Sequence, residues 1–229
     1  MNAPPVKLHV RLGRLVFGRH YRHLKKLRTQ KVNGYSLKPF DERRCIFVHI
    51  PKAAGVSVSK KLFGCLGGGH SPIADFAQVF SPTEFEDYFK FTFVRNPWDR
   101  LLSAYVFLSK GGFNGDDAEW AQRNLAPYSD FKGFVRGWVN EKNIWTKQHF
   151  YPQSYFLKID DRLAVDFVGR FENIDEDFAT IARRLGVDAR LEHLNSSGNK
   201  DYHDYYDEEC AEIVASAYRE DIALFDYRF

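Results

Sequence analysis

The chain has 229 residues, a length that suits a single domain with its own hydrophobic core. Its net charge of +3 conceals an asymmetry, because residues 1–31 carry nine Lys and Arg and no acid, so that the remaining 198 residues carry −6. An acidic body without a recognised nucleic-acid motif argues against DNA or RNA as a ligand, and we expect no nucleic-acid partner.

The basic N-terminal segment, VRLGRLVFGRHYRHLKKLR, mixes its Arg and Lys with Leu, Val, Phe and Tyr. Two interpretations stay open. The segment is either an amphipathic helix that lies on an anionic membrane surface or holds an anionic polymer, or an arm or edge helix packed on the domain. Turn-forming pairs between Asn33 and Pro39 mark a link. We therefore expect residues 1–43 to form a basic arm and link, and residues 44–229 to form the domain.

The stretch from Cys45 to Phe63, CIFVHIPKAAGVSVSKKLF, predicts a buried strand, a tight loop and a helix. Its apolar run ends at Pro51, whose missing N–H stops a sheet ladder. Small residues follow Lys52, and a helical pattern begins at Ser57. This order presents backbone N–H groups and a helix N-terminus to a phosphate, and Gly55 allows close approach of a ligand.

A second strand and helix repeat the pattern about 40 residues later. Residues 91–95 (FTFVR) predict a short strand that leaves Arg95 at its carboxyl end, where open α/β sheets bind ligands. Asn96 suits the N-cap of the following helix, and Pro97 suits its first turn. Ser103 lies about two turns into that helix.

Together the two segments, IPKAAGVS and FVRNPWDRLLSAY, resemble the signature segments of sulfotransferases that use 3′-phosphoadenosine-5′-phosphosulfate (PAPS). The first is similar to the I-P-K-T-[AG]-G-T-S loop of the carbohydrate-type branch, but Ala53 and Val56 stand where that family usually has Thr. Val56 removes one hydroxyl contact to a phosphate and keeps the N–H. Further likeness in QHFYPQSYFL, in GRFENIDEDF and at the C-terminus extends the resemblance over about residues 44–229.

The resemblance implies an α/β fold of three layers, a mostly parallel sheet flanked by helices, with a P-loop-like phosphate-binding loop. In that family the Lys and the amides after it hold the 5′-phosphosulfate of PAPS, and the Arg and Ser of the second segment hold the 3′-phosphate. The donor-binding residues implied in this chain are Lys52, Ala54, Gly55, Val56, Ser57, Val58, Arg95 and Ser103, with Ser197 of the polar loop LNSSGNK as a further ligand.

Sulfuryl transfer requires in-line geometry and stabilisation of the charge on the leaving oxygen. Lys52 fits that charge, and the acceptor hydroxyl needs a base whose pKa suits neutral pH. We predict His70 as the base, titrating at about pH 6.5. It follows three glycines, where related carbohydrate sulfotransferases place a His. His49, in the buried strand, and His149 stay open as alternatives.

We expect PAPS as the sulfate donor, adenosine 3′,5′-bisphosphate as the product, a glycan or other hydroxyl-bearing acceptor, and no metal, because no Cys, His and Asp residues cluster with ligand spacing. Two alternatives stay open. One is a P-loop kinase-like nucleoside triphosphatase, although there the Lys would follow the last Gly of the loop. The other is a non-catalytic protein that binds acidic glycans or a membrane.

Cysteine usage and hydropathy bear on the location of the protein. Cys45, Cys65 and Cys210 imply no disulfide framework, which favours a reducing compartment. No apolar run reaches the roughly 18–20 residues of a membrane span. We therefore expect a cytoplasmic location or a peripheral one at a membrane surface, with the Golgi lumen as the alternative if an upstream anchor has been removed.

Overall fold

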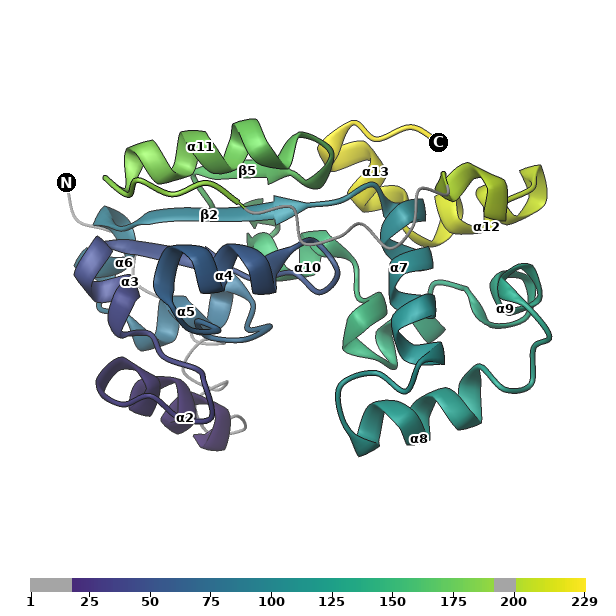
Figure 1. The fold of residues 1–229 in the computed structure, drawn as a ribbon, viewed down its shortest axis with the longest axis horizontal. Coiled ribbons are helices and arrows are strands. Elements are labelled where there is room, and N and C mark those ends of the chain that lie inside the picture. The colour runs from purple at the N-terminus through teal and green to yellow at the C-terminus, as the bar shows by residue number, and fades with distance from the viewer. Residues whose placement is uncertain (1–17, 192–200) are drawn as a thin grey trace.

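The computed structural model describes residues 18–191 and 201–229, so the expected ligand Ser197 lies outside the described residues. Figure 1 shows the arrangement of the elements. In chain order they are α2 (Gly18–Thr29), α3 (Lys38–Arg43), β1 (Cys45–Val48), α4 (Gly55–Phe63), α5 (Ile73–Val79), α6 (Pro82–Asp87), β2 (Phe89–Val94), α7 (Pro97–Ser109), α8 (Gly115–Asn124), α9 (Phe131–Trp138), η1 (Asn143–Trp145), η2 (Gln148–Phe150), α10 (Gln153–Leu157), β3 (Lys158–Ile159), β4 (Arg162–Leu163), β5 (Phe167–Arg170), η3 (Phe171–Asn173), α11 (Ile174–Arg184), η4 (Tyr202–Tyr205), α12 (Glu208–Ala217) and α13 (Arg219–Phe225).

Three parallel strands form the central sheet, in the order β1–β2–β5. Helices flank it: α11 runs beside β5, and α4 and α5 lie across β2 from α11 in the view of Figure 1. β3 and β4 form a separate antiparallel hairpin. The predicted α/β fold, a parallel sheet flanked by helices, is confirmed. The P-loop-like character of the first loop stays a prediction.

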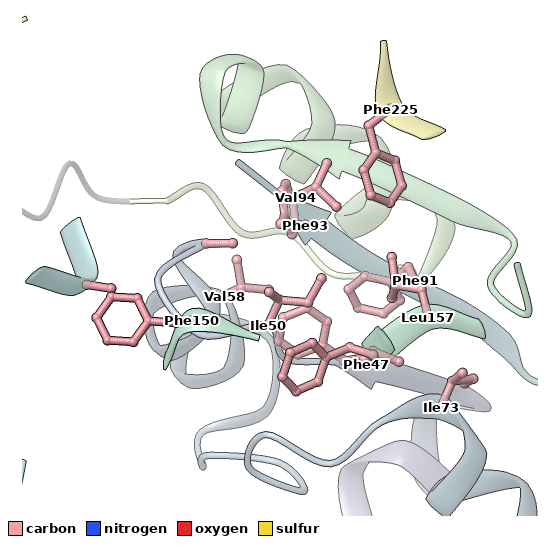
Figure 2. Packing of buried hydrophobic residues seen from close by; sticks show 14 of the residues in the cluster. Phe47, Ile50, Val58, Ile73, Phe91, Phe93, Val94, Phe150, Leu157 and Phe225 are labelled. Atoms are coloured by element: carbon pink, nitrogen blue, oxygen red, sulfur yellow. The ribbon is translucent and has the colours of Figure 1, made fainter. Parts of the chain in front are cut away.

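The core explains why the two inner segments form strands. Every residue of β1 and β2 is buried, as expected for parallel strands that are covered on both faces. Phe47 stands opposite Phe91 in the register, and their rings stack with centroids 5.0 Å apart. A Cβ at Gly169 of β5 would lie 2.7 Å from the ring of Phe93, so the glycine lets that ring pack on the third strand. Figure 2 shows these phenylalanines within the packed cluster.

The boundaries of the two signature segments follow local hydrogen bonding. β1 ends at Val48, before Pro51, because the carbonyl oxygen of His49 accepts from the side chain of His70 instead of continuing the ladder. α4 begins at Gly55, two residues before the predicted start. The predicted N-cap of α7 is confirmed, since the side chain of Asn96 accepts a hydrogen bond from the Trp98 N–H at 3.1 Å.

The helix α2, from the basic N-terminal segment, packs on the domain. Leu24 and Leu27 are each only 1% exposed, and the guanidinium of Arg28 binds the carboxylates of Asp41 and Glu84. The described part of the segment is therefore an edge helix with an apolar face on the body. The boundary between an arm and a domain at residue 43 stays a prediction.

Candidate active site

Loops from all three parallel strands meet at the carboxyl edge of the sheet. β1 leads into Lys52, β2 into Arg95 and β5 into Phe171. Nη1 of Arg95 donates to the carbonyl oxygen of Lys52 at 3.2 Å. The Arg95 guanidinium also lies over the ring of Phe171, 4.0 Å from its centroid. The three loops therefore form one site around Arg95, at the edge where open α/β sheets bind ligands.

The first loop ends in a helix N-terminus with unpaired backbone donors. Lys52 and Ala54 adopt positive φ angles of 69° and 61°, and Ala54 caps α4 without a side-chain hydrogen bond. The Val58 N–H donates to the Ala54 carbonyl at 3.2 Å and is committed to the helix. Within the described residues, the N–H groups of residues 55–57 have no hydrogen-bond partner. Orphan donors at the positive end of a helix suit an anion.

Gly55 is required by a neighbour within the protein. A Cβ at this position would lie 1.7 Å from Cδ2 and 2.2 Å from Nε2 of His49. The His49 side chain is buried, and its Nδ1 atom has no hydrogen-bond partner among the described residues. The close approach that Gly55 permits here is therefore that of the His49 ring to the first turn of α4.

Lys52 carries a partly desolvated ammonium group. Its Nζ atom lies over the ring of Phe107, 4.0 Å from the centroid. Burial, and then the nearby charge of Arg95, lower the pKa of Lys52 to about 8. The ammonium is thus still mostly charged at neutral pH, and a weakly hydrated cation can stabilise charge that develops on a neighbouring phosphate oxygen.

Asp99 and Gln153 hold Arg95 in place. Nε and Nη2 of Arg95 donate to the two carboxylate oxygens of Asp99 at 2.7 and 2.8 Å. The Arg95 backbone is clamped by the buried amide of Gln153, which accepts from the Arg95 N–H and donates to the Arg95 carbonyl, both at 2.9 Å. Both the backbone and the guanidinium of Arg95 are therefore fixed before any ligand binds.

One face of α7 joins these groups. Asp99, Ser103 and Phe107 follow one another at four-residue spacing and so share a face of the helix. The first contacts Arg95 and the last contacts Lys52, which places Ser103 between them. The half-buried Ser103 hydroxyl makes no hydrogen bond within the described part of the chain. The structure thus brings Lys52, Arg95 and Ser103 together, as the sequence predicts.

The protonation of the His70 ring follows from its contacts. Nδ1 lies 3.1 Å from the carbonyl oxygen of His49. A carbonyl can only accept, so Nδ1 carries the hydrogen, and in the neutral imidazole Nε2 has the free lone pair. Burial lowers the pKa of His70 from its ordinary value, which favours the neutral ring at pH 7. This is the form of imidazole that can accept a proton.

The three candidate bases lie in series beside the Lys52 loop. The ring centroids of His49 and His70 are 4.3 Å apart, and those of His70 and His149 are 6.3 Å apart. Burial is the largest cause that lowers the pKa of each ring, to about 4 for His149. Nδ1 of His49 and Nδ1 of His149 are buried without a partner among the described residues. Of the three, His70 is the ring whose hydrogen-bond geometry fits a base.

A comparison with protein families shows to which family the chain belongs. The model of the sulfotransferase family matches residues 40–228, most of the chain and all of the site described above. The chain belongs to the sulfotransferase family. Matches to carbohydrate sulfotransferases confirm the carbohydrate-type branch predicted from the two signature segments.

Three relatives of this sulfotransferase show how similar its sequence is to known proteins and how much of each chain is matched. Carbohydrate sulfotransferase 14 from Danio rerio is 29% identical over 179 residues, 64% of this chain and 47% of that protein. Carbohydrate sulfotransferase 12 from Mus musculus is 24% identical over 185 residues, 66% of this chain and 43% of that protein. A protein from Archaeoglobus fulgidus described as uncharacterized is 26% identical over 120 residues, 52% of this chain and 85% of that protein. The chain thus spans less than half the length of the carbohydrate sulfotransferases it matches. No solved structure matches it significantly.

The relatives also correct the expected location of this sulfotransferase. The predicted cytoplasmic location is wrong, since it is contradicted by the likeness to carbohydrate sulfotransferases 12 and 14. The prediction rested on the cysteines, and Cys45, Cys65 and Cys210 are buried free thiols that act as small hydrophobic side chains. Such residues carry no information about a redox compartment. Within the described ranges, no helix is long and apolar enough to cross a bilayer.

Sequence reasoning missed four residues of the candidate site around Arg95: Asp99, Phe107, Gln153 and Phe171. Asp99 and Phe107 had a signal, because helical spacing places them on one face with Ser103. Gln153 stood in QHFYPQSYFL without an assigned role, and its clamp on Arg95 spans 58 residues of sequence. Among the described residues, no group of His, Cys, Asp and Glu is arranged to hold a metal ion. A reaction without metal stays a prediction.

Proposed function

We propose that this member of the sulfotransferase family moves the sulfuryl group of PAPS to a hydroxyl group of a carbohydrate. The observation that carries the proposal is the contact between Arg95 and the loop of Lys52, which gathers cations and N–H donors from two parallel strands at one edge of the sheet. The carbohydrate acceptor rests on the likeness to carbohydrate sulfotransferases 12 and 14.

The donor groups of the site fit a nucleotide with phosphates at both ends of its ribose. The N–H groups of residues 55–57 and the Lys52 ammonium would hold the 5′-phosphosulfate. Arg95 uses three of its five N–H groups on Asp99 and Lys52, which leaves two for the 3′-phosphate. The Ser103 hydroxyl lies on the same face of α7 and would supply another donor.

In the proposed reaction, the acceptor oxygen attacks sulfur in line with the leaving 5′-phosphate oxygen. The bond between sulfur and the acceptor oxygen forms as the bond between sulfur and the 5′-phosphate oxygen breaks. The hydroxyl proton passes to Nε2 of His70, and the Lys52 ammonium neutralises the charge that develops on the phosphate. The products are a sulfate ester and adenosine 3′,5′-bisphosphate.

The test is a transfer assay with PAPS labelled with sulfur-35 and a panel of glycans, combined with Lys52→Ala. This variant should lower kcat by roughly 10²–10³-fold, the usual worth of one charge-stabilising group, and should weaken binding of the product nucleotide much less. Lys60→Ala is the matched control, because Lys60 is an exposed lysine on the same helix α4. It should leave both quantities unchanged.

Three other results would change the proposal. If only the KM for PAPS rose in Lys52→Ala, Lys52 would be a binding residue without a role in the chemical step. If the protein bound neither adenosine 3′,5′-bisphosphate nor ATP and sulfated no glycan in the panel, the non-catalytic alternative would be favoured. Tighter binding of ATP with magnesium than of adenosine 3′,5′-bisphosphate would point to a nucleoside triphosphatase.

A further inference from the structure

A side chain completes the hydrogen bonding at the carboxyl end of β2. The backbone pairing of β2 with β1 ends at Thr92, and its pairing with β5 ends at Val94. Arg95 lies one residue further, and its N–H and C=O groups both pair with the side-chain amide of Gln153 at 2.9 Å. A primary amide carries an acceptor and two donors, so it can replace a neighbouring strand here. Gln153 thus extends the sheet to the arginine that we assign to the 3′-phosphate.

A second set of hydrogen bonds holds Gln153 itself. Its backbone N–H donates to Oδ2 of Asp221 at 2.7 Å, and the N–H of Ser154 donates to Oδ1 at 2.8 Å. These are the first two N–H groups of α10, which Pro152 precedes without a side-chain cap. N–H groups at the start of a helix need a partner from outside the helix. The carboxylate of Asp221, in the first turn of α13, is that partner for both.

Asp221 is a carboxylate within the core, where its exposure is 0%. Burial raises the pKa of Asp221, and the charge of the buried Arg100 opposes this rise. A desolvated carboxylate is tolerated only where hydrogen bonds and nearby charge compensate it, and the two N–H bonds are short, as charge-assisted bonds are. An apolar residue at this position would leave both N–H groups without a partner.

The segment that leads to Gln153 is fixed from two sides. Arg100 of α7 donates to the carbonyl oxygens of His149 and Tyr151, at 3.3 and 2.6 Å. Residues 149–154 are therefore held by a buried cation from α7 at one end and by a buried carboxylate from α13 at the other. Gln153 has little freedom to turn away from the end of β2.

We propose that Asp221 is a positioning residue of the donor site, which fixes Arg95 through Gln153. The inference rests on the proposed function, because it takes Arg95 as the ligand of the 3′-phosphate. The carboxylate holds the first turn of α10, and the Gln153 amide then holds the Arg95 backbone. A side chain that is fixed in advance loses less conformational freedom when it binds an anion, so the contact contributes more to affinity.

Calorimetric titrations of the full chain with adenosine 3′,5′-bisphosphate and with AMP test the proposal. Asp221→Asn is nearly isosteric, but its single acceptor oxygen can serve only one of the two N–H groups. The preference for the bisphosphate should fall by about three- to tenfold, part of the value of one charge-assisted contact, and the affinity for AMP should not change. In the sulfur-35 assay, the KM for PAPS should rise and kcat should change little, because the 3′-phosphate is bound equally before and during the transfer.

Asp166→Asn is the matched control, because Asp166 makes the same kind of bond at the opposite end of β2. Its Oδ2 atom accepts from the Lys90 N–H at 2.7 Å. Removing that carboxylate should lower the denaturant midpoint of unfolding, as Asp221→Asn should also do, but it should leave the preference between the two nucleotides unchanged. A preference that falls equally in both variants would show a general loss of stability and overturn the inference.

A double variant tests the route through Gln153. Gln153→Met removes both bonds to the Arg95 backbone and keeps an unbranched side chain. It should lower the preference as Asp221→Asn does, and adding Asp221→Asn to it should cause no further decrease. Two effects that multiply in the double variant would show that Asp221 acts by another route, and they would overturn the inference.

Hydrogen exchange of the wild-type chain keeps the inference testable if a variant fails to fold. The N–H groups of Arg95, Gln153 and Ser154 should exchange through one common opening and show equal protection. The bisphosphate should slow the exchange of all three more than AMP does. Exchange of the Arg95 N–H that is independent of the other two would overturn the inference.

Failure of this inference can be told apart from failure of the proposed function. A wild-type chain that binds the bisphosphate and AMP with equal affinity contradicts the proposed donor site, and the inference falls with it. A wild-type preference that survives unchanged in Asp221→Asn leaves the donor site in place and overturns only the role of Asp221.

Discussion

The Nδ1–H group of His70 donates a hydrogen bond to the carbonyl oxygen of His49, 3.1 Å away. This bond ties the glycine-rich segment before α5 to the end of β1, directly ahead of the loop of Lys52. Gln148 holds the His70 backbone from another element, with a 3.0 Å bond to the His70 carbonyl. The orientation of the imidazole is therefore set by the protein before a substrate arrives, as a general base requires.

Replacing His70 should abolish most of the turnover and leave the donor site intact. His70→Ala and His70→Asn should both lower kcat by roughly 10²–10⁴-fold, the usual worth of general base catalysis. His70→Asn is the sharper variant, because the Asn amide can still donate to the His49 carbonyl but cannot take up a proton. Affinity for adenosine 3′,5′-bisphosphate, measured by calorimetry, should change little in either variant. Near-normal turnover in His70→Asn would move the role to His149 or His49.

The dependence of kcat/KM on pH should be bell-shaped, because burial lowers the pKa of His70, which sets the acidic limb, and the pKa of Lys52, which sets the basic limb. His70 must be neutral to accept a proton, so the rate should rise with pH through a pKa that burial lowers below the 6.5 expected from sequence. Lys52 must be charged, so the rate should fall as pH rises through about 8. A stopped assay between pH 5 and 10 measures both limbs.

Two variants assign these limbs. The acidic limb should vanish in His70→Asn, and the basic limb should move to higher pH in Lys52→Arg, because a guanidinium stays charged throughout this range. The basic limb of kcat should also lie above that of kcat/KM, since a bound phosphosulfate favours the charged form of Lys52. A profile whose limbs are unchanged in both variants would contradict these roles.

Gly55→Ala should destabilise the protein through its clash with the His49 ring. The added Cβ would lie 1.7 Å from Cδ2 of that ring, and such overpacking costs about 1–3 kcal/mol of unfolding free energy. The cost should shrink in a His49→Ala background, giving a coupling energy of about 0.5–3 kcal/mol in a double-mutant cycle followed by denaturant unfolding. Gly115→Ala, where a Cβ would meet nothing within 4 Å, is the control. Additive effects of the two changes would show that His49 is not what requires the glycine.

The fold and the donor side of the site follow largely from short-range patterns. A buried apolar run before Pro51 and another before Arg95 predict two parallel strands, and parallel strands bring the residues that follow them to one edge of the sheet. Ser103 then falls beside them because of helical spacing along α7. For these residues, local sequence and one rule of topology are sufficient.

The remaining parts of the site depend on contacts that no local pattern encodes. Gln153 clamps the Arg95 backbone from 58 residues away, and Phe171 meets the Arg95 guanidinium because β5 pairs with β2. From the sequence, Gly55 was expected to allow close approach of a ligand. In the structure, the group that comes close to Gly55 is the side-chain ring of His49. The lowered pKa values of Lys52 and His70 come from burial, which a sequence does not quantify.

The measurement that tests the central claim most directly is a calorimetric comparison of adenosine 3′,5′-bisphosphate with AMP, using the wild-type chain, Arg95→Ala and the exposed control Arg43→Ala. Contacts to a charged phosphate contribute about 1.5–3 kcal/mol each, so the wild type and the control should prefer the bisphosphate by roughly tenfold or more. Arg95→Ala should lose most of that preference while still binding AMP. Equal affinity of the wild type for the two nucleotides, or a preference that survives in Arg95→Ala, would contradict a PAPS site at this edge of the sheet.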